Sequence, residues 1–332
     1  MKSHKRRFLI RTSFAVIASL AAALPLTTQA QSNDAWPSKP LRLIVGYASG
    51  SSPDIQARML AEPLSKALGQ AVVIENKPGA SGNIGADLIA KATDNHTIGV
   101  IGNGPLTSSK FLYPSLRYDP LKDFAPIALI GSAPLVWAVP KAALKGSAQD
   151  YLKQARADGA TLNYGSVGAG SGGHLGVELL KDSLGIDPVH VPYTGGPLII
   201  NDMVGGEIDM TLLPGSTVQP LVQSGKLAAV AVTSAERSPL APDLPSMKEL
   251  GAKDVNIEVW NAVMAPASMP ASYRAKLSAA LVTILQSDNI KKTLFQQGWK
   301  VDDPSPDALA ERIKSDTALY GDLIARKHIK LE

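Results

Sequence analysis

Short hydrophobic segments alternate with amphipathic ones from Trp36 onward. Residues 41–47, 71–76 and 97–101 are rich in aliphatic and β-branched side chains and have the length of buried strands. Between the second and third of these, Ile84, Leu88 and Ile89 are spaced as on one face of a helix. This first third of the chain therefore predicts strands and helices in alternation.

The helix expected after the first strand has clear signals at its start. Ser52 is a good N-cap, Pro53 suits the first helical position, and Asp54 favours the positive end of the helix dipole. Pro63 should kink the helix. Its apolar positions recur at helical spacing and are Ile55, Met59, Leu60, Leu64 and Leu68.

The same alternation restarts in the middle of the chain. We expect strands over residues 161–164, 189–193, 208–213 and 227–233, and helices over residues 175–184, 198–204, 272–286, 290–297 and 306–325. Strict alternation of strand and helix implies a parallel sheet. Two α/β halves are indicated, and residues 127–139 and 256–265 should be strands that cross between them.

The first thirty residues predict a cleaved signal peptide. They contain five basic and no acidic side chains, then an apolar stretch over residues 14–26, and then Thr28-Gln29-Ala30 with small side chains near a cleavage point. A transmembrane anchor is the rival interpretation, but 13 apolar residues are short of the roughly 20 needed to span a bilayer. We expect cleavage after Ala30 and a periplasmic protein, with the Sec and twin-arginine routes both open.

Composition then narrows the function classes. The 332 residues include 33 Lys+Arg and 29 Asp+Glu, a net charge of +4, but residues 31–332 hold 28 basic against 29 acidic side chains. Because no cluster of basic side chains follows Arg11, the sequence argues against nucleic acid as a partner. The absence of cysteine excludes thiol catalysis, iron–sulfur clusters and thiolate zinc sites, and we expect neither cofactor nor metal.

The segment Gly168-Ala-Gly-Ser-Gly-Gly173 fits the glycine pattern of dinucleotide sites, G-x-G-x-x-G. The acidic residue that such a site needs at the end of the next strand is missing, since Asp187 precedes that strand. Two interpretations remain: a tight turn without a ligand, or an anion site on free backbone N–H groups at a helix start. The loop of residues 49–52 has a similar position after a strand and also lacks Lys and Arg, so the two loops together favour a carboxylate.

Signals for catalysis are weak. No serine occurs in a G-x-S-x-G motif. His174 opens a helix and is better explained as a cap or loop anchor than as a base, and Asp54 as a carboxylate that fixes a loop. Trp260 and Tyr47 fit either the core or an apolar wall of a ligand site.

Several segments stand out by their sequence and their order along the chain: residues 36–45, 75–86, 118–127, 163–166, 190–195, 205–209 and 224–233. Together they resemble the Bug family of extracytoplasmic solute receptors of tripartite tricarboxylate transporters. The resemblance implies a type II periplasmic-binding-protein fold in which two α/β lobes enclose a ligand cleft. It places lobe 1 at residues 36–135 plus 260–332 and lobe 2 at residues 136–259.

The resemblance also implies a function: capture of a small carboxylate and its delivery to integral-membrane transporter subunits. Carried over onto this sequence, the ligand contacts fall on Tyr47, Ser49, Gly50, Ser51, Ser52 and Asp54, on Ser166, Gly168, Gly170, Ser171 and His174, and on Tyr193, Thr194 and Gly195, with Asn103 and Asp209 nearby. An exported enzyme that uses Asp54, His174 or Asp209, and a ligand-presenting sensor, are the alternative functions.

The first loop departs from the family pattern, which resembles Pro-Phe-x-x-Gly-Gly-x-Thr-Asp. Here Gly46 and Pro53 occupy the proline and threonine positions, so one hydroxyl and one backbone donor are missing. We expect Ser51 or Ser52 to supply the hydroxyl.

Overall fold

The computed structural model describes residues 36–158, 161–252 and 255–331. The predicted signal peptide and its cleavage point lie outside the described residues. No helix within these ranges has the length and apolar character needed to cross a membrane.

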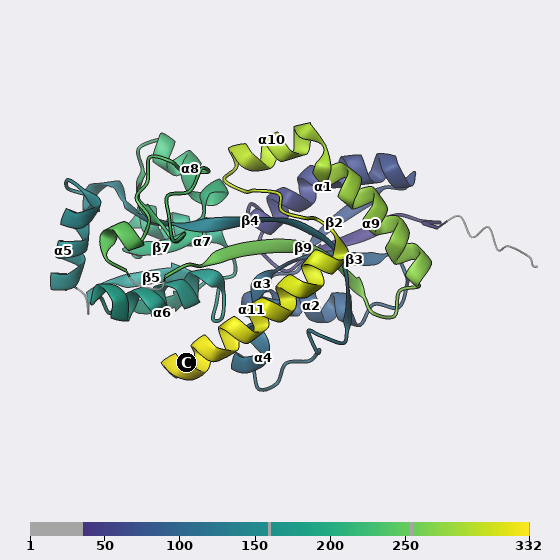
Figure 1. Cartoon of the computed structure of the whole chain (residues 1–332), viewed down its shortest axis with the longest axis horizontal. Coiled ribbons are helices and arrows are strands. Elements are labelled where there is room, and N and C mark those ends of the chain that lie inside the picture. The colour runs from purple at the N-terminus through teal and green to yellow at the C-terminus, as the bar shows by residue number, and fades with distance from the viewer. Residues whose placement is uncertain (1–35, 159–160, 253–254, 332) are drawn as a thin grey trace, which may run out of the picture. The chain divides into compact units, whose positions relative to one another are not determined.

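The strands and helices follow the predicted alternation closely (Figure 1). The strands are β1 (Leu41–Val45), β2 (Val72–Asn76), β3 (Thr97–Gly102), β4 (Phe124–Pro140), β5 (Asn163–Ser166), β6 (Val189–Pro192), β7 (Met210–Pro214), β8 (Leu227–Val232) and β9 (Glu258–Pro266). The α-helices are α1 (Ser52–Leu68), α2 (Asn83–Ala90), α3 (Asn103–Leu106), α4 (Ser109–Leu112), α5 (Ala148–Asp158), α6 (Gly172–Leu184), α7 (Gly196–Gly205), α8 (Gly215–Gln223), α9 (Ala271–Gln286), α10 (Asp288–Gln296) and α11 (Pro306–Lys327). Short 3-10 turns lie at Ala80–Gly82, Lys141–Ala143 and Lys248–Leu250.

The sheet is mixed, so the expectation of a purely parallel sheet was wrong. The strand order is β2-β1-β3-β9-β4-β7-β5-β6, and β8 pairs with β4. β1 is parallel to β2 and β3, and β5 is parallel to β6 and β7, as predicted. The long strands β4 and β9 are antiparallel to their neighbours. Because they are also antiparallel to each other, β4 runs in the direction of β1 and β3 and opposite to β7, whereas β9 runs opposite to β3.

β4 belongs to both halves of the sheet. Its first part, Phe124 to Pro134, pairs with β9, whereas Leu135 to Pro140 pair with β7 and β8. Residues 127–139 and 256–265 are thus the connecting strands that the sequence predicted. The exact lobe boundaries, at residues 135/136 and 259/260, stay a prediction.

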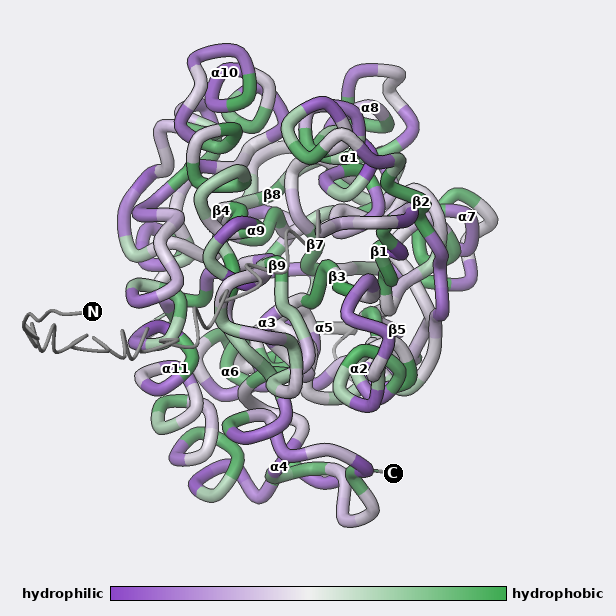
Figure 2. The backbone as a smooth tube through the Cα atoms, turned by 90° about the vertical axis from the view of Figure 1, so that its right-hand side faces the viewer, coloured by the Kyte–Doolittle hydropathy of each residue, from purple (hydrophilic) through white to green (hydrophobic). Residues whose placement is uncertain are grey.

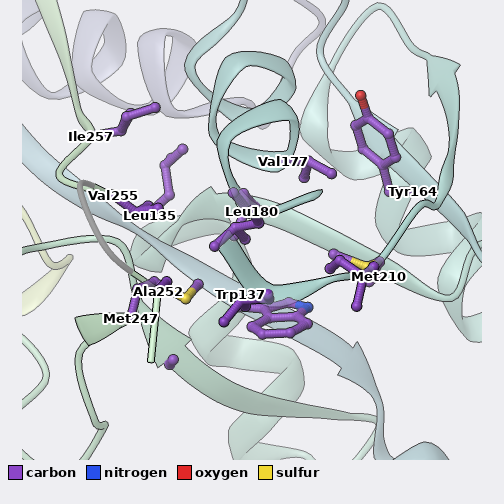
Figure 3. Close-up of a cluster of buried hydrophobic side chains, with 14 of the residues drawn as sticks. Leu135, Trp137, Tyr164, Val177, Leu180, Met210, Met247, Ala252, Val255 and Ile257 are labelled. Carbon is purple, nitrogen blue, oxygen red and sulfur yellow. The ribbon is translucent and has the colours of Figure 1, made fainter. Parts of the chain in front are cut away.

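Separate hydrophobic clusters fill the two halves. Trp137 of β4 packs with Met210 of β7 and Leu180 of α6 in the second half (Figure 3). In the first half, Leu43 of β1 packs with Leu60 of α1. In Figure 2, green hydrophobic segments mark the strands of the interior, and purple and green alternate along the outer helices.

Helix α11 packs on both halves. Leu309 and Ile313 near its start join a cluster with Trp260 of β9, whereas Tyr320 and Leu323 farther along join the cluster around Trp137. Figure 1 shows α11 crossing from one half of the sheet toward the other.

Local details differ from the sequence predictions in α1. Its N-cap is Ser51 rather than Ser52. The helix continues past Pro63 to Leu68, and the kink expected at Pro63 stays a prediction. Its buried face contains Gln56, Ala57, Leu60, Leu64 and Leu68, so Ile55 and Met59 lie at the margin.

Helices α3, α4, α5 and α8 were not predicted. The first two have only four residues each. α5 has three buried apolar positions, Tyr151, Leu152 and Ala155, in an otherwise polar segment. α8 begins with glycine and contains Pro220, both of which argue against a helix in sequence.

Candidate functional site

A cavity of about 60 Å³ lies at the carboxyl ends of strands from both halves of the sheet. Tyr47 follows β1, Asn103 follows β3, Val167 follows β5 and Pro214 ends β7, and all four residues line it. Asn261 of the connecting strand β9 completes one wall. Ligands of open α/β sheets bind at this end of the strands.

Among the described residues, four helices of nine or more residues begin at this cavity. Ser52 and Pro53 of α1, Gly172 and Gly173 of α6, and Gly196 of α7 line it. Pro214 and Thr217, the N-cap and third residue of α8, line it as well. The first N–H groups of a helix have no partner within the helix, and the helix dipole is positive at this end. Together these helix starts favour an anion in the cavity.

The described residues that line the cavity carry no Lys, Arg, His, Asp or Glu side chain. Their one ionisable group is the Tyr47 phenol, which is buried and donates a hydrogen bond to the Ser81 carbonyl oxygen at 3.0 Å. Burial raises the pKa of Tyr47 far above its usual value, so this group stays neutral. An anion here would meet helix dipoles, hydroxyls and amides and no cationic side chain, as the loops without Lys and Arg predicted.

Asp54 holds the first loop in place from behind the cavity. Its carboxylate accepts hydrogen bonds from Gly50 N at 2.9 Å and Asn76 Nδ2 at 2.9 Å, and pairs with Arg58 at 2.9 Å. The Ser49 hydroxyl also lies 3.3 Å from it. Burial alone would raise the pKa of Asp54, but these hydrogen bonds lower it below its usual value. Ser49, Gly50 and Asp54 therefore shape the loop and do not line the cavity.

The second loop is held by its own side chains. Ser171 caps α6 by accepting a hydrogen bond from His174 N at 3.3 Å. The His174 Nδ1 atom accepts a hydrogen bond from Gly170 N at 3.1 Å. Of the predicted residues in this loop, Ser171 lines the cavity, and His174 anchors the backbone. Gly168 and Gly170 adopt φ angles of 111° and 80°, which favour glycine.

A second cavity of about 530 Å³ lies on the other side of this loop. The predicted site residues Gly168, His174, Tyr193 and Thr194 line this cavity and not the smaller one. His190 also lines it, and its ring lies 4.4 Å from that of His174. Burial lowers the pKa of both imidazoles to about 4, so both are neutral at pH 7.

Direct hydrogen bonds join the two halves around the smaller cavity. The Ser81 hydroxyl donates to the Ala169 carbonyl oxygen at 2.8 Å, and Ala48 N donates to the Thr194 carbonyl oxygen at 3.3 Å. Gly195 lies against the first loop, since a Cβ added there would be 2.8 Å from Ser51 Oγ. The cleft between the halves is therefore closed in this structure.

Two further predicted residues, Asp209 and Ser166, line neither cavity. Asp209 precedes β7, and its carboxylate accepts a hydrogen bond from Asn163 N, at the start of β5, at 2.7 Å. The smaller cavity touches β7 at its opposite end, Leu212 to Pro214, so Asp209 does not line it. Ser166 is fully buried, and its hydroxyl lies 2.7 Å from His190 Nε2.

Other residues of the smaller cavity were not foreseen. Asn261, Thr217 and Trp299 line it, and Gln56 of α1 is bonded to Asn261. Gln56 and Asn261 could have been noticed in the sequence because each is a polar residue inside a hydrophobic pattern. Trp260, which fitted either core or ligand wall, belongs to the core and donates its indole N–H to Asp316.

No cluster of three or more His, Cys, Asp or Glu side chains that would suit a metal ion occurs within the described ranges.

Comparisons with known proteins agree with this architecture. Residues 56–329 match the family model described as the tripartite tricarboxylate transporter family receptor, TctC. The protein BugT of Bordetella pertussis is 31% identical over 319 residues, which are 95% of this chain and 96% of BugT.

Two solved structures share the fold. The R. palustris protein Rpa4515 with adipate is 30% identical, with a TM-score of 0.86 over 89% of this chain and 100% of that one. MatC of Rhodopseudomonas palustris with bound malate is 29% identical, with a TM-score of 0.81 over 87% and 99%. The predicted type II periplasmic-binding-protein fold is confirmed. The chain belongs to the tripartite tricarboxylate transporter receptor family, the Bug-type proteins, which are solute-binding receptors and not enzymes.

Proposed function

We propose that this protein captures a small carboxylate in the 60 Å³ cavity and delivers it to the membrane subunits of a tripartite tricarboxylate-type transporter. One observation carries the proposal: the starts of α1, α6, α7 and α8 surround a cavity without charged side chains. Partial positive charges and free N–H donors then favour a carboxylate over a cation or an uncharged solute.

Ser51 supports this assignment. Its side chain is 3% exposed, lines the cavity, and its hydroxyl has no hydrogen-bond partner. A buried hydroxyl without a partner costs about 1–3 kcal/mol, which a bound carboxylate oxygen would recover. Ser51 therefore supplies the hydroxyl that Pro53 removes from the loop, and Ser52, which also lines the cavity, lies next to it.

From the loops and helix starts that line the cavity, the proposed ligand residues are Tyr47, Ser51, Ser52, Asn103, Ser171, Gly172, Gly173 and Gly196. Ser49, Gly50, Asp54, Gly170, His174, Thr194 and Gly195 shape or close the loops around them. Solved structures of two relatives, one with adipate and one with malate, support a carboxylate.

Closure of the two lobes is part of the proposal. β4 and β9 connect the halves, so bending of these strands would open the cleft at the predicted boundaries, residues 135/136 and 259/260. Residues 1–30 would direct the receptor to the periplasm and be removed there.

A thermal-shift screen against small carboxylates, amines and neutral solutes tests the proposed binding. A ligand at 100 times its dissociation constant stabilises the folded state by about 2.7 kcal/mol and raises the melting temperature accordingly. We expect shifts with carboxylates. Shifts with only cationic or uncharged compounds would contradict the proposal, and uptake of the identified acid by cells with and without the receptor then tests delivery.

A further inference from the structure

Two buried side-chain amides form a pair beside the cavity. Gln56 of α1 is 1% exposed and Asn261 of β9 is 4% exposed. Asn261 Nδ2 donates a hydrogen bond to Gln56 Oε1 at 2.8 Å, and Asn261 also lines the cavity. Amides are rarely buried in a protein core unless their hydrogen bonds are satisfied.

This pair is only partly satisfied within the protein. Gln56 Nε2 is buried without a partner, and the bond to Gln56 is the only side-chain hydrogen bond that Asn261 makes among the described residues. Asn261 Oδ1 is therefore an acceptor without a protein partner at the cavity wall. Rotation of both amide groups by 180° would preserve their mutual bond and turn an N–H of Asn261 toward the cavity instead. The pair can thus present either an acceptor or a donor to a ligand.

A ligand hydroxyl matches this pair better than a charged group does. A hydroxyl is neutral and both donates and accepts hydrogen bonds. An ammonium group or a second carboxylate would lose its hydration and find no opposite charge among the described lining residues. A hydrogen atom in place of the hydroxyl would leave Asn261 without a partner.

We propose that the Gln56–Asn261 pair determines specificity and that the ligand is a small hydroxy acid. Its carboxylate lies at the helix starts and its hydroxyl on Asn261. This inference rests on the proposed function, because it assumes that a carboxylate occupies the cavity.

Calorimetric titration with matched acids tests the inference. Lactate, propionate and alanine share a three-carbon skeleton and differ in a hydroxyl, a hydrogen or an ammonium group at carbon 2, and malate, succinate and aspartate form the matching four-carbon set. We expect the hydroxy acid of the set that fits to bind about tenfold more tightly than its deoxy analogue, with the amino acid weakest.

The double variant Gln56→Leu/Asn261→Leu replaces the pair by apolar side chains of similar size, so that no amide is left unpaired. We expect it to bind hydroxy and deoxy acids with equal affinity, because neither acid then finds an amide to pair with or leaves one unpaired. Ser51→Ala, by contrast, should lower the affinity for both acids by the same factor.

The possible failures are distinct. Equal affinities of the native protein for hydroxy and deoxy acids, or a hydroxyl preference that persists in the double variant, would overturn the role of the pair and leave carboxylate binding intact. Absence of binding by every carboxylate would overturn the proposed function itself, and the inference with it.

Discussion

The hydroxyl of Ser108, between α3 and α4, donates a hydrogen bond to the carbonyl oxygen of Gly170 at 2.6 Å. This bond connects the first half of the fold to the glycine loop that begins α6, and the Ser81–Ala169 bond lies beside it. The glycine loop, which forms part of the cavity wall, thus connects the two halves of the fold directly.

Loss of this bond should favour the open cleft. Ser108→Ala leaves the Gly170 carbonyl without this donor, which costs about 1 kcal/mol and should weaken ligand binding about fivefold. Calorimetry measures the affinity, and small-angle scattering should show a larger radius of gyration without ligand. Ser272→Ala, at an exposed position of α9, is the control and should change neither quantity.

Gly195 should be required for closure. A methyl group there would lie 2.8 Å from both Ser51 Oγ and Ala48 Cβ. The φ angle of 176° is accessible to alanine, so the substitution introduces a contact across the cleft without backbone strain. We expect Gly195→Ala to reduce affinity by about tenfold or more while the unliganded protein keeps its stability.

Gly205 provides the matched control for this substitution. It lies near the end of α7, and an added Cβ would meet no atom within 4 Å. Gly205→Ala should bind ligand normally and be slightly more stable, by about 0.5–1 kcal/mol. Equal effects of the two substitutions would argue against a closing role for Gly195.

Asp54 should contribute to stability in a pH-dependent way. Because hydrogen bonds lower its pKa in the folded state, its contribution is present above the usual pKa of aspartate and is lost as the pH falls through the lowered value. Asp54→Asn should reduce the free energy of unfolding at pH 7 by about 1–3 kcal/mol. In urea titrations at several pH values, the variant should also lose less stability than the native protein as the pH falls. Glu62→Gln breaks an exposed, solvent-screened ion pair with Lys66 and should leave the free energy of unfolding essentially unchanged.

The histidine pair should affect stability in a different pH window. Burial lowers the pKa of His174 and His190 from 6.5 to about 4, so the unfolded chain binds more protons than the folded one between these values. The contribution of the two neutral imidazoles to the free energy of unfolding is fully present above about pH 6.5. It is lost as the pH falls toward 4, at about 1.4 kcal/mol for each histidine and each pH unit. We expect His190→Gln to reduce this slope in chemical denaturation. An unchanged slope would mean that the imidazoles titrate normally.

The order of strands and helices could be predicted from sequence because hydrophobic periodicity and turn residues report directly on local structure. The antiparallel pairing of β4 and β9 with their neighbours could not, since strand direction depends on pairing between segments more than 100 residues apart, such as Ala128 and Val263. α8 was missed because the burial of Val218 outweighs the unfavourable Gly215 and Pro220.

The loops of the site were predicted more accurately than the roles of their residues. Glycines and serines after β1 and β5 mark both loops in sequence. Which of their side chains line the cavity depends on how the halves meet, so His174 and Thr194 face the larger cavity although their loops border the smaller one. Gln56 and Asn261 each stand out as a polar residue inside a hydrophobic pattern, but they are 205 positions apart, so their pairing has no local signal.

The central claim is that helix starts, and not cationic side chains, hold a carboxylate. The most direct measurement compares, by calorimetry, the best-binding acid with its primary amide, at about 20 mM and about 500 mM salt. We predict that the acid binds, that the amide does not, and that the affinity of the acid changes little between the two salt concentrations. An amide that binds as tightly as the acid would contradict the account, and so would a steep loss of acid affinity at high salt.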